Sequence, residues 1–156
     1  MPHSEPAALS FAAMIAQAFT VDSAVLSLEG GTDPAFGTVQ WRTLISGDRT
    51  PSTGLVLGVA EFGAYGTLLP HRHAPEEFYF CLSGDGVVTI EGTPHPITPG
   101  VAIYIPAEAE HGVVAGTEGL TFVYGFARNS FGEVDYRFSA PANIDAPIDE
   151  ASAITL

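Results

Sequence analysis

Residues 66–79 of the chain read GTLLPHRHAPEEFY. The stretch predicts two short strands around a Pro-containing turn, and side chains two positions apart on a strand point to the same face. His71 and His73 therefore project together from the first strand, and Glu77 and Tyr79 project together from the second. Two imidazoles and a carboxylate that converge in this way form half of a metal site.

A further ligand is expected from a later part of the chain. His111 is the candidate, because it follows a predicted strand over residues 101–105 and a loop that begins at Pro106. Histidine and carboxylate ligands suit several divalent transition metals. We therefore predict one such ion, held by His71, His73, Glu77 and His111, with Fe(II) or Mn(II) favoured and Zn, Ni or Co as alternatives.

The rest of the chain favours an all-β fold. Short runs rich in Val, Ile, Phe and Tyr alternate with Gly- and Pro-containing turns, as is typical of a β-sandwich or barrel. The expected strands are residues 25–28, 39–46, 55–62, 67–73, 77–82, 87–91, 101–105, 112–115, 120–127 and 134–138, with turns at 83–86 and 93–96. Before them, residues 7–21 fit a short amphipathic helix that Ser4 caps.

The 156 residues suit one domain of ordinary size. We divide the chain into an N-terminal helical arm at residues 1–22, a β-barrel at 23–140 and a C-terminal tail at 141–156. The apolar segment at 7–21 is too short to span a bilayer, and it lacks the positive residues that precede the apolar part of a secretory signal. We therefore expect a cytoplasmic protein.

The charge composition excludes several classes of function. The chain has 5 Lys and Arg against 18 Asp and Glu, for a net charge of −13. All five basic residues are arginines, so there is no basic surface for a nucleic acid or an anionic membrane, and no lysine for Schiff-base chemistry. The single cysteine, Cys81, excludes an internal disulfide and a zinc site built from cysteines.

The central part of the sequence resembles the cupin superfamily. The pattern His-x-His-x3-Glu-x6-Gly, which ends at Gly84, matches the first cupin motif, and Pro99-Gly100 followed by Pro106-x4-His111 matches the second. There are two departures: Gly66 lies one place too close to His71, and Ala115 stands where an asparagine is common. The resemblance implies a jelly-roll β-barrel with one divalent metal in its mouth and frequent homodimers. A degenerate cupin would keep the barrel without the metal, but such chains usually lose ligands.

Within the superfamily, the chain resembles the cupin-type dimethylsulfoniopropionate (DMSP) lyases. The resemblance rests on His71, His73, Glu77, Tyr79 and His111 together. It implies a small-molecule substrate whose carboxylate binds the metal. Tyr79 would act as the base that removes the adjacent proton, and β-elimination would then give dimethyl sulfide and acrylate. Trp41 and Tyr65 are candidates for substrate binding through cation–π contact with the sulfonium, although both could instead be core residues.

Two other functions remain open at this stage. An Fe(II)-dependent cupin dioxygenase would use the same ligands and leave positions for O₂ and a chelating substrate. A non-catalytic small-molecule-binding cupin would have a polar cavity, whereas the inward faces expected here are mainly Val, Ile, Phe and Tyr. Tyr79 itself could be a packing residue with no chemical role.

Overall fold

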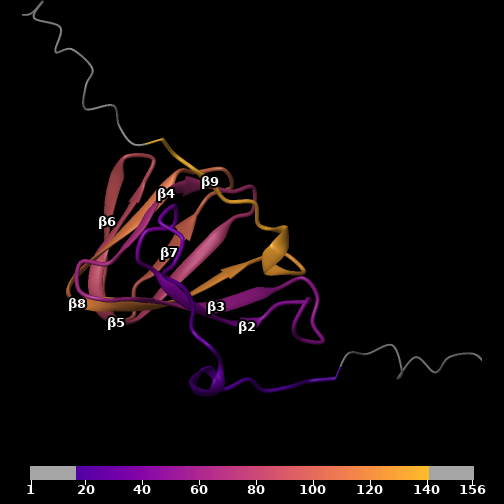
Figure 1. The fold of residues 1–156 in the computed structure, drawn as a ribbon. Coiled ribbons are helices and arrows are strands. Elements are labelled where there is room, and N and C mark those ends of the chain that lie inside the picture. The colour runs from indigo at the N-terminus through magenta and orange to yellow at the C-terminus, as the bar shows by residue number, and fades with distance from the viewer. Residues whose placement is uncertain (1–16, 141–156) are drawn as a thin grey trace, which may run out of the picture.

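The computed structural model describes residues 17–140, and nearly all of its regular structure is β-strand. The elements are η2 (Ser23–Val25), β1 (Glu29–Gly30), β2 (Gln40–Ile45), β3 (Val56–Phe62), β4 (Thr67–Arg72), β5 (Glu77–Ile90), β6 (Thr93–Ile97), β7 (Ala102–Ile105), β8 (His111–Phe126), η3 (Phe131–Glu133) and β9 (Arg137–Phe138). Figure 1 shows the strands curling around a common interior, which confirms the predicted all-β barrel.

Strands β5 and β8 organise the barrel. They pair antiparallel along almost their whole lengths, from Glu77 opposite Phe126 to Ile90 opposite His111. The other edge of β8 pairs first with β4 and then with β3, so one strand joins both halves of the sheet. Strands β6 and β7 extend the sheet beyond β5, and β2 and β1 extend it beyond β3. The apolar side chains that face the interior form one continuous core.

Several local predictions were wrong. Residues 25–28 are not a strand but the end of η2 and an irregular segment before β1. Of the strand expected at 134–138, only Arg137–Phe138 forms one, because only these residues pair with β4. Residues 83–86 are not a turn but part of β5, because shifts of register near Ser83 and Gly84 absorb extra residues without reversing the chain. The segments 112–115 and 120–127 are likewise one strand, β8. Residues 93–97 form β6 despite Pro94 and Pro96, which the fold tolerates because β6 is an edge strand that pairs with β5 alone.

The predicted terminal segments fall largely outside the described residues. Residues 17–22 of the expected helical arm are described and contain no helix, whereas residues 1–16 and the predicted tail at 141–156 lie outside the description. Among residues 17–140, no helix is long and apolar enough to cross a membrane.

Gly84, the last position of the first motif, has a steric reason to be glycine. Its φ is +75°, and a Cβ built on it would lie 2.1 Å from the main-chain oxygen of Gly119 on β8. Gly92 provides a matched comparison, because its φ is +78° but nothing lies within 4 Å of a Cβ there.

We expect Gly84→Ala to lower the free energy of unfolding far more than Gly92→Ala does. The positive φ alone costs about 1–2 kcal/mol at either position. The collision with β8 adds about 1–3 kcal/mol at Gly84. Urea unfolding of both variants measures the difference, and equal losses would show that the contact with Gly119 is not limiting.

Candidate metal centre

The four predicted ligands come together in the interior. His71 lies near the end of β4 and His111 begins β8, where the two residues are direct partners in the strand pairing. His73 follows β4, and Glu77 is the first residue of β5. All four side chains are buried, and one ligand atom from each lies within 4.8 Å of the others.

Main-chain carbonyls fix the orientation of the three imidazoles. Each Nδ1 lies against the carbonyl oxygen of a residue two positions away: 2.8 Å from His71 to Leu69, 3.0 Å from His73 to Pro75, and 2.9 Å from His111 to Ala109. A carbonyl oxygen only accepts hydrogen bonds, so each Nδ1 carries the proton. Each Nε2 is therefore left with a free lone pair, the form that binds a metal.

These lone pairs face the carboxylate of Glu77. Its Oε2 lies 3.1 Å from Nε2 of His73 and 3.0 Å from Nε2 of His111. Nε2 of His71 is buried and has no hydrogen-bond partner within residues 17–140. Three imidazole lone pairs and a carboxylate that converge without an intervening cation would repel one another. The donor set fits a divalent transition metal, with nitrogen and oxygen ligands of the kind that Fe, Mn, Zn, Ni and Co accept.

The electrostatics of the cluster favour the protonation states in which these side chains can bind a metal. Burial lowers the pKa of His71 to about 3, so its imidazole is neutral at ordinary pH. The pKa of the Glu77 carboxyl lies below its ordinary value although burial opposes its ionisation, because His111 and His73 lie against its Oε2. Neutral imidazoles and an ionised carboxylate are the states that bind a cation.

Aromatic rings from the end of the described chain cover the histidines. Tyr136 stacks on His71 with ring centroids 4.9 Å apart and meets His73 edge-on at 5.3 Å. Phe138 also contacts His71, and its backbone pairs with that residue through β9. Sequence reasoning missed Tyr136 as a residue of the site. The alternation of Val134, Tyr136 and Phe138 was the available signal, because it places all three on one face.

A small cavity adjoins the cluster. Its lining is almost entirely apolar or aromatic and consists of Phe36, Val39, Trp41, Ala60, Leu68, Glu77, Tyr79, Phe122, Tyr124, Phe131 and Tyr136. Tyr79 is 1% exposed and stacks on Phe122 with ring centroids 4.0 Å apart, and its hydroxyl has no hydrogen-bond partner in the part of the chain that the structure describes. Burial and the charge of Glu77 raise the pKa of Tyr79 well above its ordinary value.

The two predicted substrate-binding residues lie in different places. Trp41 on β2 is part of the cavity lining and packs against Phe36 at 5.4 Å. Tyr65 lies between β3 and β4, is 66% exposed, and is absent from the lining. Cys81 is buried on the core side of β5, as expected for a structural cysteine.

Comparison with known proteins agrees with this geometry. The family model for the cupin domain matches residues 58–124. Dimethylsulfoniopropionate lyase DddW of Ruegeria pomeroyi is 57% identical over 122 residues, covering 78% of this chain and 80% of that protein.

Solved structures are similar in fold at much lower identity. The polyketide cyclase RemF of Streptomyces resistomycificus is 21% identical with a TM-score of 0.68, and the match covers 81% of this chain and 89% of RemF. A structure from a study of the DMSP lyases RdDddP and RnDddQII is also 21% identical, with a TM-score of 0.63, over 74% of this chain and 63% of that one.

Proposed function

Because the chain belongs to the cupin superfamily and, within it, to the family of dimethylsulfoniopropionate lyases, we propose that it cleaves DMSP to dimethyl sulfide and acrylate. The observation that carries the proposal is the buried cluster of three histidines and one glutamate beside a cavity walled by aromatic rings. The cluster suits the anionic end of a small zwitterion, and the aromatic wall suits its cationic end.

His71, His73, Glu77 and His111 would hold one divalent transition metal, and we favour Fe(II) or Mn(II). The bound ion would supply a Lewis acid for the substrate carboxylate and for the negative charge that develops on the adjacent carbon. The carbonyls behind the three Nδ1 atoms keep the imidazoles aimed at one point, so the protein offers a rigid set of ligands.

Tyr79 is the base in this proposal. As a phenolate it takes the proton from the carbon next to the carboxylate, and the electron pair of that C–H bond forms the new C–C double bond. The C–S bond breaks, and its electron pair leaves with dimethyl sulfide. Burial keeps the phenol of Tyr79 protonated in the structure as described, so the base role requires a cation next to Glu77 to offset that effect.

The cavity wall would hold the sulfonium group. Trp41 and the neighbouring rings present π-faces, and each such contact with a desolvated cation contributes about 0.5–2 kcal/mol. The net charge of −13 is compatible with a substrate that carries a positive end. The homodimer that the cupin resemblance implies and the cytoplasmic location both stay predictions.

Release of dimethyl sulfide from DMSP by the purified protein tests the proposal, with matched reactions in air and under nitrogen. We expect equal rates in both, because the elimination consumes no oxidant. No dimethyl sulfide in either reaction would overturn the lyase proposal. Oxygen-dependent consumption of another carboxylate would instead favour the cupin dioxygenase.

Removal of the metal is expected to abolish turnover reversibly. We expect dialysis against a chelator to lower the rate at least about 100-fold, since the carboxylate and its developing charge lose their binding partner. Adding back Fe(II), Mn(II), Zn(II), Ni(II) or Co(II) one at a time, with elemental analysis, identifies the ion that restores the rate. Full activity in protein shown to be metal-free would contradict the proposed centre.

A further inference from the structure

Tyr124 is a second phenol in the cavity wall, and the proposed elimination does not use it. It lies on β8 directly opposite Tyr79 on β5, and it is 5% exposed. Its hydroxyl, like that of Tyr79, is buried and has no hydrogen-bond partner among the described residues. The aromatic contacts of its ring are with Phe126 and Phe131. An unpartnered polar group in an otherwise apolar cavity calls for a ligand or a partner.

The strand register places Tyr124 over a glycine and toward β2. Gly58 on β3 pairs with Tyr124 on one side and with Thr43 on the other. A Cβ on Gly58 would lie 2.4 Å from both Cζ and the hydroxyl oxygen of Tyr124. The phenol ring therefore lies over β3, in the space that a side chain at position 58 would occupy. Its hydroxyl is directed to the part of the sheet where Thr43 lies, buried at 6% exposure.

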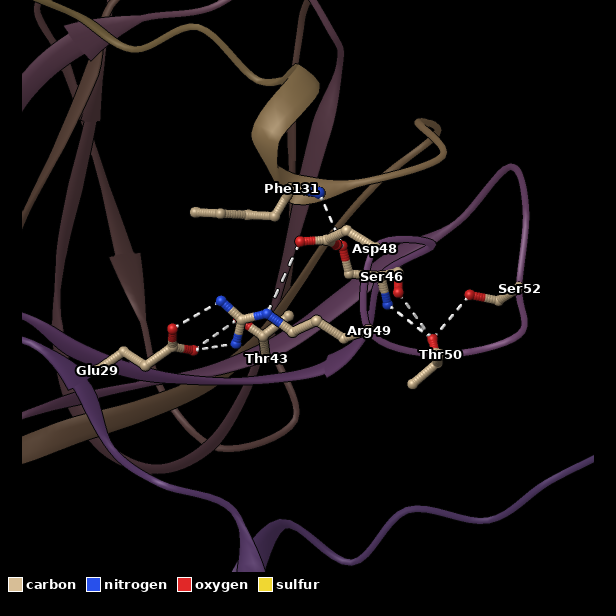
Figure 2. A network of polar contacts seen from close by, with 8 residues as sticks. All are labelled: Glu29, Thr43, Ser46, Asp48, Arg49, Thr50, Ser52 and Phe131. Carbon is tan, nitrogen blue, oxygen red and sulfur yellow. Dashed lines mark hydrogen bonds and ion pairs between the residues drawn. The ribbon is translucent and has the colours of Figure 1, made fainter.

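Thr43 belongs to a polar network behind the cavity wall, shown in Figure 2. Its hydroxyl donates to Oε2 of Glu29 at 3.0 Å, and Arg49 donates to both oxygens of the same carboxylate at 2.8 Å. These bonds from Arg49 hold the pKa of Glu29 below its ordinary value, so the carboxylate stays ionised and accepts only. The proton of Thr43 is thus committed to Glu29, and its oxygen is left as an acceptor.

The loop that follows β2 also contacts Phe131, another residue of the cavity wall. Ser46, which follows β2 and is fully buried, accepts a hydrogen bond of 2.9 Å from the main-chain nitrogen of Phe131. Arg49 lies in this loop, three residues further along. The segment at residues 43–49 therefore supports both Phe131 and the surroundings of Tyr124 from outside the cavity.

We propose that Tyr124 is a specificity residue for the cationic end of the ligand, and that Thr43, Glu29 and Arg49 are positioning residues that set the direction of its hydroxyl. In the ligand-bound protein, Tyr124 donates to Thr43, Thr43 donates to Glu29, and Arg49 donates to Glu29. The oxygen lone pairs of Tyr124 then face the cavity.

A phenol held in this direction is an acceptor for the cavity. It attracts the positively polarised methyl groups of a sulfonium or quaternary ammonium, and it has no proton to offer an anion or a neutral acceptor. Burial raises the pKa of Tyr124, so its phenol stays protonated and has a proton to donate to Thr43. The inference rests on the proposed function for the carboxylate end of the ligand, which the metal centre binds.

Two probes of equal shape test this selectivity. 3-(Trimethylammonio)propanoate carries a positive nitrogen where 4,4-dimethylpentanoate carries a neutral carbon, and the two molecules are otherwise the same. Trp41 is the only tryptophan of the chain and lies in the cavity wall, so its fluorescence reports binding of either probe to Mn(II)-loaded protein. The quantity measured is the ratio of the two dissociation constants.

We expect Tyr124→Phe to weaken binding of the cationic probe about 5- to 30-fold while leaving the neutral probe within about twofold. Thr43→Val, which keeps the shape but removes the hydroxyl, should reproduce part of this loss, and Thr43→Ser should restore the wild-type ratio. Tyr104→Phe, a change at an exposed tyrosine on β7, is the matched control and should have no effect.

The possible outcomes separate this inference from the proposed function. A ratio that is unchanged in Tyr124→Phe would overturn the inference even if the protein releases dimethyl sulfide, and so would failure of both probes to bind the wild-type protein. A ratio that collapses in Tyr124→Phe would support it even in a protein without lyase activity. Equal weakening of both probes would assign Tyr124 to packing and would also overturn the inference.

Discussion

We expect His71→Ala to lose both the metal and the lyase activity. Nε2 of His71 is buried with no hydrogen-bond partner among the described residues, which leaves its lone pair available to a cation. Removing it leaves two imidazoles and one carboxylate, and the metal content should fall from about one ion per chain to a small fraction of that. The rate of dimethyl sulfide release should drop at least about 100-fold, because the elimination depends on that ion.

Elemental analysis and the rate assay are made on the same preparations. His95→Ala is the matched control, because His95 is exposed on the edge strand β6 and should tolerate the change without effect. His71→Gln guards against a cavity that unfolds the barrel, since it keeps most of the buried volume. A folded His71 variant with full metal content and full turnover would refute the assignment of this residue as a ligand.

The cluster of three histidines and one glutamate could be predicted from sequence because its arrangement is mostly local. His71, His73 and Glu77 lie within seven positions of one another, and strand alternation alone places them on a shared face. His111 is distant in sequence, and only the second cupin motif identified it. The structure supplies the physical link, because His111 is the direct strand partner of His71.

The cavity wall could not be predicted in the same way. Thr43, Gly58 and Tyr124 meet because β2, β3 and β8 pair in one particular register, and a shift by one residue would turn every one of these side chains to the opposite face. No local pattern encodes that register. Glycine is also ambiguous in a sequence: Gly84 relieves a collision with β8, whereas Gly58 makes room for a ring.

Proline and glycine misled the strand predictions for a related reason. Both residues favour turns when they are considered alone, and tertiary pairing overrode that preference in β5, β6 and β8. These errors did not displace the residues of the candidate metal centre, because Glu77 and His111 begin β5 and β8, and His71 and His73 lie at and just after the end of β4.

Tyr79→Phe is expected to separate metal binding from catalysis. The change removes one oxygen and leaves the ring, so the stacking on Phe122 at 4.0 Å and the packing of the core should survive. The metal content should therefore stay at the wild-type level. The kcat for dimethyl sulfide release should fall about 10²- to 10⁴-fold, the usual contribution of a positioned general base.

Exchange of the substrate proton for deuterium gives a second measurement, which would not change if Tyr79 were only a packing residue. In deuterated water, a protein that forms the elimination base can exchange the proton next to the carboxylate, and Tyr79→Phe should abolish any such exchange along with turnover. Tyr104→Phe is again the control, since Tyr104 is 65% exposed on the outer side of β7. If Tyr79→Phe keeps kcat within about twofold of the wild type, the base lies elsewhere.

Tyr136, the buried phenol stacked on His71, then becomes the residue to replace. Burial raises the pKa of its phenol as it does that of Tyr79, and the same cation would offset the effect.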